Sequence, residues 1–189
     1  AAIAAGLNVY AMVGGCPREL SMDQSITDTH WRAFGPAAYS EFVRFVTAAA
    51  QRFGTTIRHW LFGNEPNLVK SAPYYARFWA GDSSAPNATT MATVHALFYN
   101  AIKAVNPNLL VGAGGWSNYY AANANNRTET FAVPILNDGL FDFVDCHAYP
   151  NFANAHYTLL DPITGTTTTN SLTTRTEALR TAMVTAGQG

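Results

Sequence analysis

Four apolar runs separated by helix-like segments constrain the fold of this 189-residue chain more than any other feature. The runs cover residues 7–13, 57–63, 109–113 and 141–148. Near-continuous apolar runs of this length are typical of strands that are buried on both faces of a parallel sheet. Because such strands alternate with helices in βαβ units, the sequence predicts an α/β fold. The pattern alone does not separate a doubly wound sheet from a (β/α)8 barrel.

The segments between the runs place apolar residues at helical spacing. The first predicted helix has Pro36 at its start and Gly54 after its end, which is the usual asymmetry of helix termini. A second helix is expected over residues 91–105. A third and shorter helix is expected around residues 131–136, with Pro134 near its start, and a fourth close to the C-terminus.

The second run ends in the sequence Gly-Asn-Glu-Pro-Asn, residues 63–67. Pro66 biases Glu65 toward extended backbone angles and prevents a helix from starting there. A carboxylate held at a strand exit, beside an amide side chain, is well placed to transfer a proton. Asn-Glu-Pro alone is a weak signal, and a solvated turn after a strand is the alternative interpretation.

Three motifs carry a family resemblance. Residues 62–67, which follow a strand, resemble the fourth-strand signature of glycoside hydrolase clan A. Residues 143–150 (Phe-Val-Asp-Cys-His-Ala-Tyr-Pro) resemble the sixth strand of the clan, which often ends in His-x-Tyr, and residues 104–112 resemble the connection into the fifth strand. The clan contains retaining (β/α)8-barrel enzymes such as endoglucanases, mannanases, β-xylosidases and β-glucuronidases. The motifs occur in the right order and are specific for the clan, but they do not identify one family or substrate.

The resemblance implies a partial (β/α)8 TIM barrel that contains strands three to six with their helices. A complete barrel usually needs about 250 residues. We therefore expect residues 1–189 to form one incomplete catalytic barrel that is truncated at both ends.

The resemblance also implies a retaining glycosidase that cleaves β-linked glycans by double displacement, with Glu65 as the general acid/base. Such enzymes use two carboxyl groups about 5 to 5.5 Å apart. The second one, the nucleophile, would be a glutamate at the end of the seventh strand, downstream of Gly189. The other glutamates are expected in loops (Glu19 and Glu129) or in helices (Glu41 and Glu177). We expect the full-length protein to be an O-glycosidase and the 189-residue chain alone to be inactive.

Four residues are candidates for substrate binding. By resemblance, Asn64 donates a hydrogen bond to the 2-hydroxyl of the sugar, Tyr149 hydrogen-bonds the nucleophile and His147 lines the sugar subsite. Structural alternatives are a strand-end turn for Asn64 and a core pair for the other two. Trp116 follows the fifth strand through Gly114 and Gly115, where a flat apolar ring can pack against a sugar.

Other polar residues near the motifs are expected to be structural. Asp145 shares a strand face with His147 but lies deeper, so we expect it to be a partner and not a catalyst. Asp142, His59 and His95 are expected to be structural as well.

Composition and the absence of certain motifs exclude several classes of function. Eleven basic and twelve acidic residues give a net charge of −1, and no basic stripe indicates nucleic-acid binding. The apolar runs are too short to span a membrane. The sequence contains no phosphate loop, zinc motif or nucleophile elbow, so we predict no cofactor and no metal. A polar surface with only 12% charged residues suits a secreted enzyme that acts on oligo- or polysaccharides, and oligomeric state is not indicated.

Two other interpretations stay open. The first is a non-catalytic carbohydrate-binding TIM barrel that kept Glu65 and lost the nucleophile. The second is an unrelated βαβ protein in which the Asn-Glu-Pro turn is incidental, and it predicts that Asn64, Glu65, His147 and Tyr149 do not converge.

Overall fold

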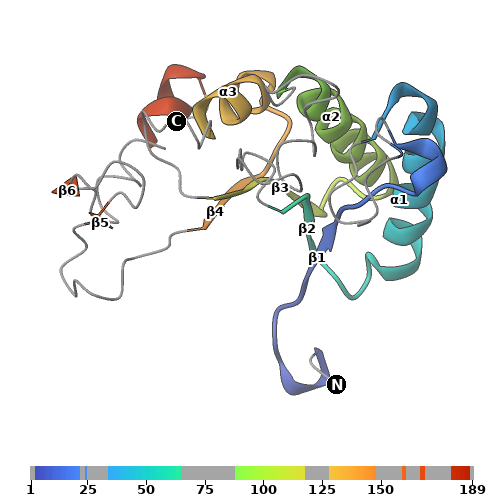
Figure 1. The fold of residues 1–189 in the computed structure, drawn as a ribbon. Helices are drawn as coiled ribbons and strands as arrows, with labels where there is room; N and C mark the ends of the chain where they lie inside the picture. The colour runs from blue at the N-terminus through green and yellow to red at the C-terminus, as the bar shows by residue number, and fades with distance from the viewer. Residues whose placement is uncertain are drawn as a thin grey trace.

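Four parallel strands form the central sheet of the protein (Figure 1). The computed structural model describes residues 3–21, 24, 34–64, 88–117, 128–147, 159–160, 167–168 and 180–187. The strands are β1 (Tyr10–Val13), β2 (His59–Phe62), β3 (Leu110–Ser117) and β4 (Phe143–His147), and each pairs in parallel with the next. Consecutive parallel strands with a helix between β2 and β3 and another between β3 and β4 confirm the predicted α/β fold and the partial TIM barrel.

The long helices lie on one side of this sheet (Figure 1). They are α1 (Tyr39–Phe53), α2 (Ala88–Val105) and α3 (Thr128–Asp138), and residues 180–185 are also helical. Short 3-10 helices are η1 (Ile3–Ala5), η2 (Arg18–Leu20) and η4 (Pro36–Ala38), the last of which leads into α1. A separate antiparallel pair joins β5 (Leu159–Leu160) to β6 (Thr167–Thr168).

Alternation along the strands gives the sheet two different faces. The residues that pack against the helices include Trp60, Phe62, Val111 and Ala113, all fully buried in one apolar cluster. Ala11 and Val13 of β1 also pack against this cluster, whereas Tyr10 and Met12 are 61% and 50% exposed. Because neighbouring residues of a strand point to opposite faces, Tyr10 and Met12 lie on the face that turns away from α1–α3.

Aromatic rings hold β2 against α1 and α2. The ring of Phe62 lies 5.5 Å from that of Phe42 on α1 and 5.6 Å from that of Phe98 on α2. Phe34 adds a fourth ring, 4.5 Å from Phe42. Such pairs each contribute about 0.5–1.5 kcal/mol beyond the burial of their area. The carboxyl end of β2 is therefore fixed by close packing.

Two expectations from the sequence are wrong in detail. Pro134 lies inside α3 and not near its start, because the helix already begins at Thr128. Proline removes one backbone hydrogen bond there, but Ile135 and Leu136 are fully buried and their packing holds the helix. For the same reason Glu129 lies in a helix and not in a loop.

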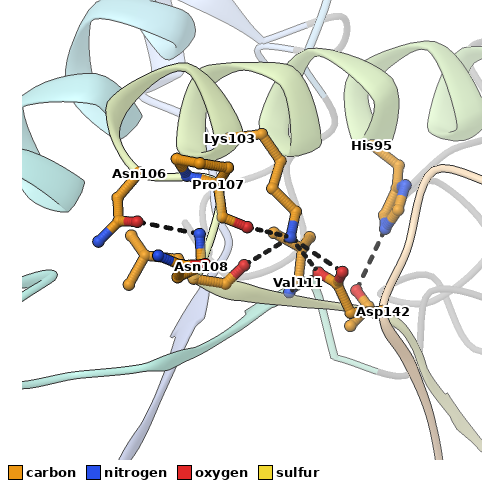
Figure 2. A network of polar contacts seen from close by, with 9 residues as sticks. His95, Lys103, Asn106, Pro107, Asn108, Val111 and Asp142 are labelled. Carbon is orange, nitrogen blue, oxygen red and sulfur yellow. Dashed lines mark hydrogen bonds and ion pairs between the residues drawn. The ribbon is translucent and has the colours of Figure 1, made fainter.

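A polar cluster joins α2 to the amino ends of β3 and β4 (Figure 2). The Lys103 ammonium donates hydrogen bonds to the carbonyl oxygens of Pro107 and Leu109, at 3.1 and 2.7 Å, and to Asp142 Oδ1 at 2.9 Å. The other oxygen of Asp142 accepts the Val111 N–H at 2.7 Å, while the Asp142 N–H donates to the Val111 carbonyl at 2.7 Å. The predicted structural role of Asp142 is confirmed.

Removal of this carboxylate should destabilise the protein. We expect Asp142→Ala to lower the free energy of unfolding by about 2 kcal/mol, because it leaves the Val111 N–H without its acceptor and removes the ion pair with the Lys103 ammonium, which keeps its two carbonyl acceptors. Asp142→Asn should cost about half as much, since an amide oxygen can still accept from Val111. Urea unfolding of the variants measures both values.

The matched control is Glu41→Gln. Glu41 pairs with Arg44 on the surface of α1, where the side chains are 47% and 79% exposed, so its loss should cost less than about 0.5 kcal/mol. Equal destabilisation by Asp142→Ala and Glu41→Gln would contradict the role given to the cluster.

Candidate active site

The exit of β2 turns at Gly63. Its φ of 78° lies in the left-handed region that glycine adopts without steric cost. The Gly63 N–H donates to the Val13 carbonyl at 2.8 Å, which ties this turn to the end of β1. Asn64 follows directly and is exposed. The amide side chain predicted to bind substrate is therefore attached at the carboxyl edge of the sheet.

Strand β3 carries a bulge at the same edge. Gly114 pairs with Asp145, but the next pair is Trp116 with Cys146, so Gly115 is an extra residue. The φ angles of Gly114 and Gly115 are 129° and 64°. β-Bulges occur preferentially beside active sites, where they redirect side chains. Strand β3, which carries the bulge, lies between β2, whose exit leads to Asn64, and β4.

His147 ends β4 on the same strand face as Asp145. Its Nε2 lies 3.9 Å from Asp145 Oδ2, and the two side chains are 27% and 32% exposed. The shared face predicted from strand alternation is confirmed, and this separation allows an ion pair when the imidazole is protonated. His147 also pairs across the sheet with Ser117, the last residue of β3.

A hollow of ≈ 360 Å³ lies on the face of the sheet that turns away from α1–α3. Its lining includes Tyr10, His59, Leu61, Phe143 and Asp145. The rings of His59 and Phe143 meet edge to face, with centroids 5.9 Å apart. His59, for which the sequence predicts a structural role, shares this face of β2 with Leu61.

Trp116 is fully buried, with 0% of its surface exposed, in the same apolar cluster as the helix-facing residues of the sheet. Uninterrupted alternation after Val111 and Ala113 would have placed it on the opposite face, and the extra residue of the bulge reverses that assignment. Its contact with a sugar stays a prediction, and in this structure its ring belongs to the core.

The structure describes two of the four other predicted site residues. Asn64 and His147 lie at the carboxyl edges of β2 and β4, on either side of β3. Glu65 and Tyr149 lie outside the described residues, so convergence of all four side chains stays a prediction. Of the other glutamates, Glu19 lies in η2, Glu41 in α1 and Glu129 in α3, whereas Glu177 is outside the described part. None of those three ends a strand.

Among the described residues, no group of three or more His, Cys, Asp and Glu side chains could hold a metal ion. Within the same part of the chain, the helices are too short or too polar to span a lipid bilayer.

Comparison with known proteins places the sequence in a family. A sequence profile described as "Cellulase (glycosyl hydrolase family 5)" matches residues 18–188. The chain belongs to this cellulase family. Membership confirms the resemblance to clan A glycosidases and makes the chain part of a glycoside hydrolase family. Curated proteins gave no match.

A solved structure similar to this cellulase-family chain is a Paenibacillus polymyxa xyloglucanase from glycoside hydrolase family 44. Sequence identity is 17% and the TM-score is 0.38, over 57% of this chain and 25% of the xyloglucanase. The match thus spans a quarter of the length of that protein.

In this cellulase-family chain, the buried side chain of His95 links α2 to β3 at Gly112, two residues before the bulge begins. His95 is 1% exposed, and its Nε2 lies 3.1 Å from the Gly112 carbonyl oxygen (Figure 2). Since a carbonyl only accepts, Nε2 carries the proton. Burial lowers the pKa of His95 to about 4, although the Gly112 carbonyl and the charge of Asp138 act in the opposite direction. His95 is therefore neutral at pH 7 in the folded protein, in agreement with its predicted structural role.

The lowered pKa predicts acid sensitivity. The unfolded chain binds a proton at His95 near pH 6.5 and the folded chain only near pH 4, so its contribution to stability is complete above pH 6.5 and is lost as the pH falls toward 4. The free energy of unfolding should fall by about 2 kcal/mol from this residue between pH 7 and pH 5.

Urea unfolding at both pH values, with His95→Gln, measures this contribution. The variant should show a smaller decrease than the wild type, whereas the control His59→Gln, at a partly exposed site, should retain the full decrease. An unchanged pH dependence in His95→Gln would contradict the assignment.

Proposed function

We propose that the full-length protein is a retaining glycoside hydrolase that cleaves β-linked glycans by double displacement. The observation that carries the proposal is the position of Asn64, two residues after the end of the parallel strand β2, at its carboxyl edge. Active sites of (β/α)8 barrels are built at that edge. Glu65 is the next residue in the sequence, and membership of the cellulase family supports its assignment as general acid/base.

In the first step Glu65 protonates the glycosidic oxygen while the nucleophile attacks the anomeric carbon. The leaving alcohol departs, and a covalent glycosyl-enzyme forms. In the second step the Glu65 carboxylate removes a proton from water, and that water releases the sugar with retained configuration. The nucleophile is a glutamate at the end of the seventh barrel strand, downstream of Gly189, so the 189-residue chain alone is inactive.

Three further residues serve substrate binding in this proposal. The Asn64 amide donates a hydrogen bond to the sugar 2-hydroxyl, a contact that strengthens in the transition state. His147 lines the sugar subsite, and Tyr149 holds the nucleophile by a hydrogen bond. The substrate is an oligo- or polysaccharide, and the polar, weakly charged composition supports an extracellular site of action.

Replacement of Glu65 tests the acid role through the leaving group. On a substrate that releases a sugar or alkyl alcohol, Glu65→Gln should lower kcat/KM by about 10²- to 10⁴-fold, because the leaving oxygen needs a proton. On a dinitrophenyl β-glycoside the loss in kcat/KM should stay below about tenfold, since that anion leaves without protonation. Glu41→Gln, an exposed carboxylate on α1, is the matched control and should change neither value. Equal losses on both substrates would contradict general acid catalysis by Glu65.

The stereochemical outcome tests the double displacement. Proton NMR of the first product formed from a β-linked oligosaccharide should show the β-anomer before mutarotation. First appearance of the α-anomer would contradict a retaining mechanism. Tight binding of glycans by the full-length protein without any hydrolysis would favour the carbohydrate-binding barrel, in which another residue occupies the nucleophile position.

A further inference from the structure

The two glycines of the β3 bulge each meet the backbone of a different neighbouring strand. At Gly114 an added Cβ would overlap the carbonyl oxygen of Asp145 on β4. At Gly115 an added Cβ would lie 3.0 Å from the carbonyl oxygen of Gly63 and 3.6 Å from the Cα of Asn64. At these two glycines the backbones of β4 and of the turn after β2 therefore come close to β3, at the carboxyl edge where Asn64 and His147 are attached.

At the exit of β2, Gly63 has a neighbouring strand on each side. On one side its N–H donates to the Val13 carbonyl of β1 at 2.8 Å. On the other side its carbonyl oxygen lies 3.0 Å from the position that a Cβ of residue 115 would take, so a side chain there would press on it. An added Cβ at Gly63 would meet nothing within 4 Å. The close contact between the two strands therefore lies at the Cβ position of Gly115 on β3 and not at that of Gly63.

The same bulge sets the register of β4. Because Gly115 is inserted, Ser117 pairs with His147. One extra residue thus determines both how closely β2 approaches β3 and which part of β4 lies opposite the end of β3. A displacement of this bulge would change the relative positions of Asn64 and His147.

We propose that Gly115 is a positioning residue of the active site, which sets the place of Asn64 relative to His147 through the backbone of Gly63. The proposal rests on the proposed glycosidase function. It assigns a role to a residue that touches no substrate, and it predicts that a single methyl group at Gly115 impairs the chemistry more than the fold. Small misplacements of a catalytic group can cost large factors in rate, because the reacting atoms must be aligned.

The test compares Gly115→Ala with Gly6→Ala in the full-length protein. The two glycines have similar positive φ angles, 64° and 76°, so both substitutions impose a similar backbone cost. Gly6 has nothing within 4 Å of an added Cβ, whereas Gly115 has the Gly63 carbonyl at 3.0 Å. Because the Gly63 carbonyl must shift to admit the methyl group, we expect Gly115→Ala to lower the urea midpoint somewhat more than Gly6→Ala, with both variants still folded. Gly115→Ala should lower kcat/KM on a β-linked oligosaccharide about tenfold, and Gly6→Ala less than twofold.

The loss should fall on kcat more than on KM, because the Asn64 contact strengthens in the transition state. Gly115→Asn keeps the added Cβ but tolerates left-handed backbone angles better, so it provides the comparison if Gly115→Ala does not fold. It should show the same loss in kcat. Equal kcat/KM for the Gly115 and Gly6 variants, in an active wild type, would overturn the positioning role and leave the glycosidase function intact.

Backbone amide NMR separates the two proposals. The signals of Gly63 and Asn64 should move in Gly115→Ala and stay in place in Gly6→Ala. Failure of the wild type to hydrolyse any β-glycan would overturn the proposed function, while moved Asn64 signals would still support the contact. Unmoved Asn64 signals in Gly115→Ala would overturn the positioning proposal whatever the activity.

Discussion

The packing of Phe62 against Phe42 and Phe98 is the interaction on which the candidate site depends. Phe62 is the last residue of β2, is 1% exposed, and directly precedes the turn at Gly63. Its ring cannot leave the helix side of the sheet without opening a cavity that costs about 3–5 kcal/mol. Asn64, two residues further on, is therefore attached to a fixed point of the core although it is itself exposed. Functional groups on such rigid supports keep their geometry better than groups on loops.

The two ends of the sheet are built from different chemistry. At the amino ends of β3 and β4, the charged side chains of Lys103 and Asp142 tie helix, loop and strands together. At the carboxyl ends, the glycines of β3 allow close contacts with the backbone of its neighbours. This division follows the general rule for (β/α)8 barrels, in which one face of the barrel supplies stability and the other supplies chemistry. Glycine at the site edge costs conformational entropy, and the polar cluster at the other end helps to offset that cost.

Most of the fold could be predicted from sequence because its signals are local. Strand alternation correctly placed His147 and Asp145 on one face, and helical spacing correctly located α1 and α2. Glycosidase family membership, which the motifs around Asn64 and His147 indicated, is confirmed as well. These features need only a window of a few residues, since periods of 2 and 3.6 are set by the backbone itself.

The features that could not be predicted depend on contacts between distant segments. The burial of Trp116 follows from the inserted Gly115. Glycine inside a strand is a known sign of a β-bulge. The apolar pattern, however, is the same for a bulged strand and for a straight strand that contains two glycines. The local sequence around Pro134 predicts the start of a helix. In the structure α3 continues through Pro134, because the neighbouring residues are packed in the core. The pair β5 and β6 is two residues long in each strand, which is too short for any periodic signal.

The glycines of β3 are best understood together. A Cβ at Gly112 would lie 2.5 Å from the Phe143 ring and 2.9 Å from Leu61 Cδ1, so its absence makes room for the large side chains of both neighbouring strands on the face with the hollow. Gly114 admits the backbone of β4, and Gly115 admits the turn after β2. A stretch that resembles a flexible glycine-rich loop is therefore a tightly surrounded strand. Its lack of side chains brings the neighbouring strands close, and it is this closeness that sets the spacing between Asn64 and His147 at the edge of the sheet.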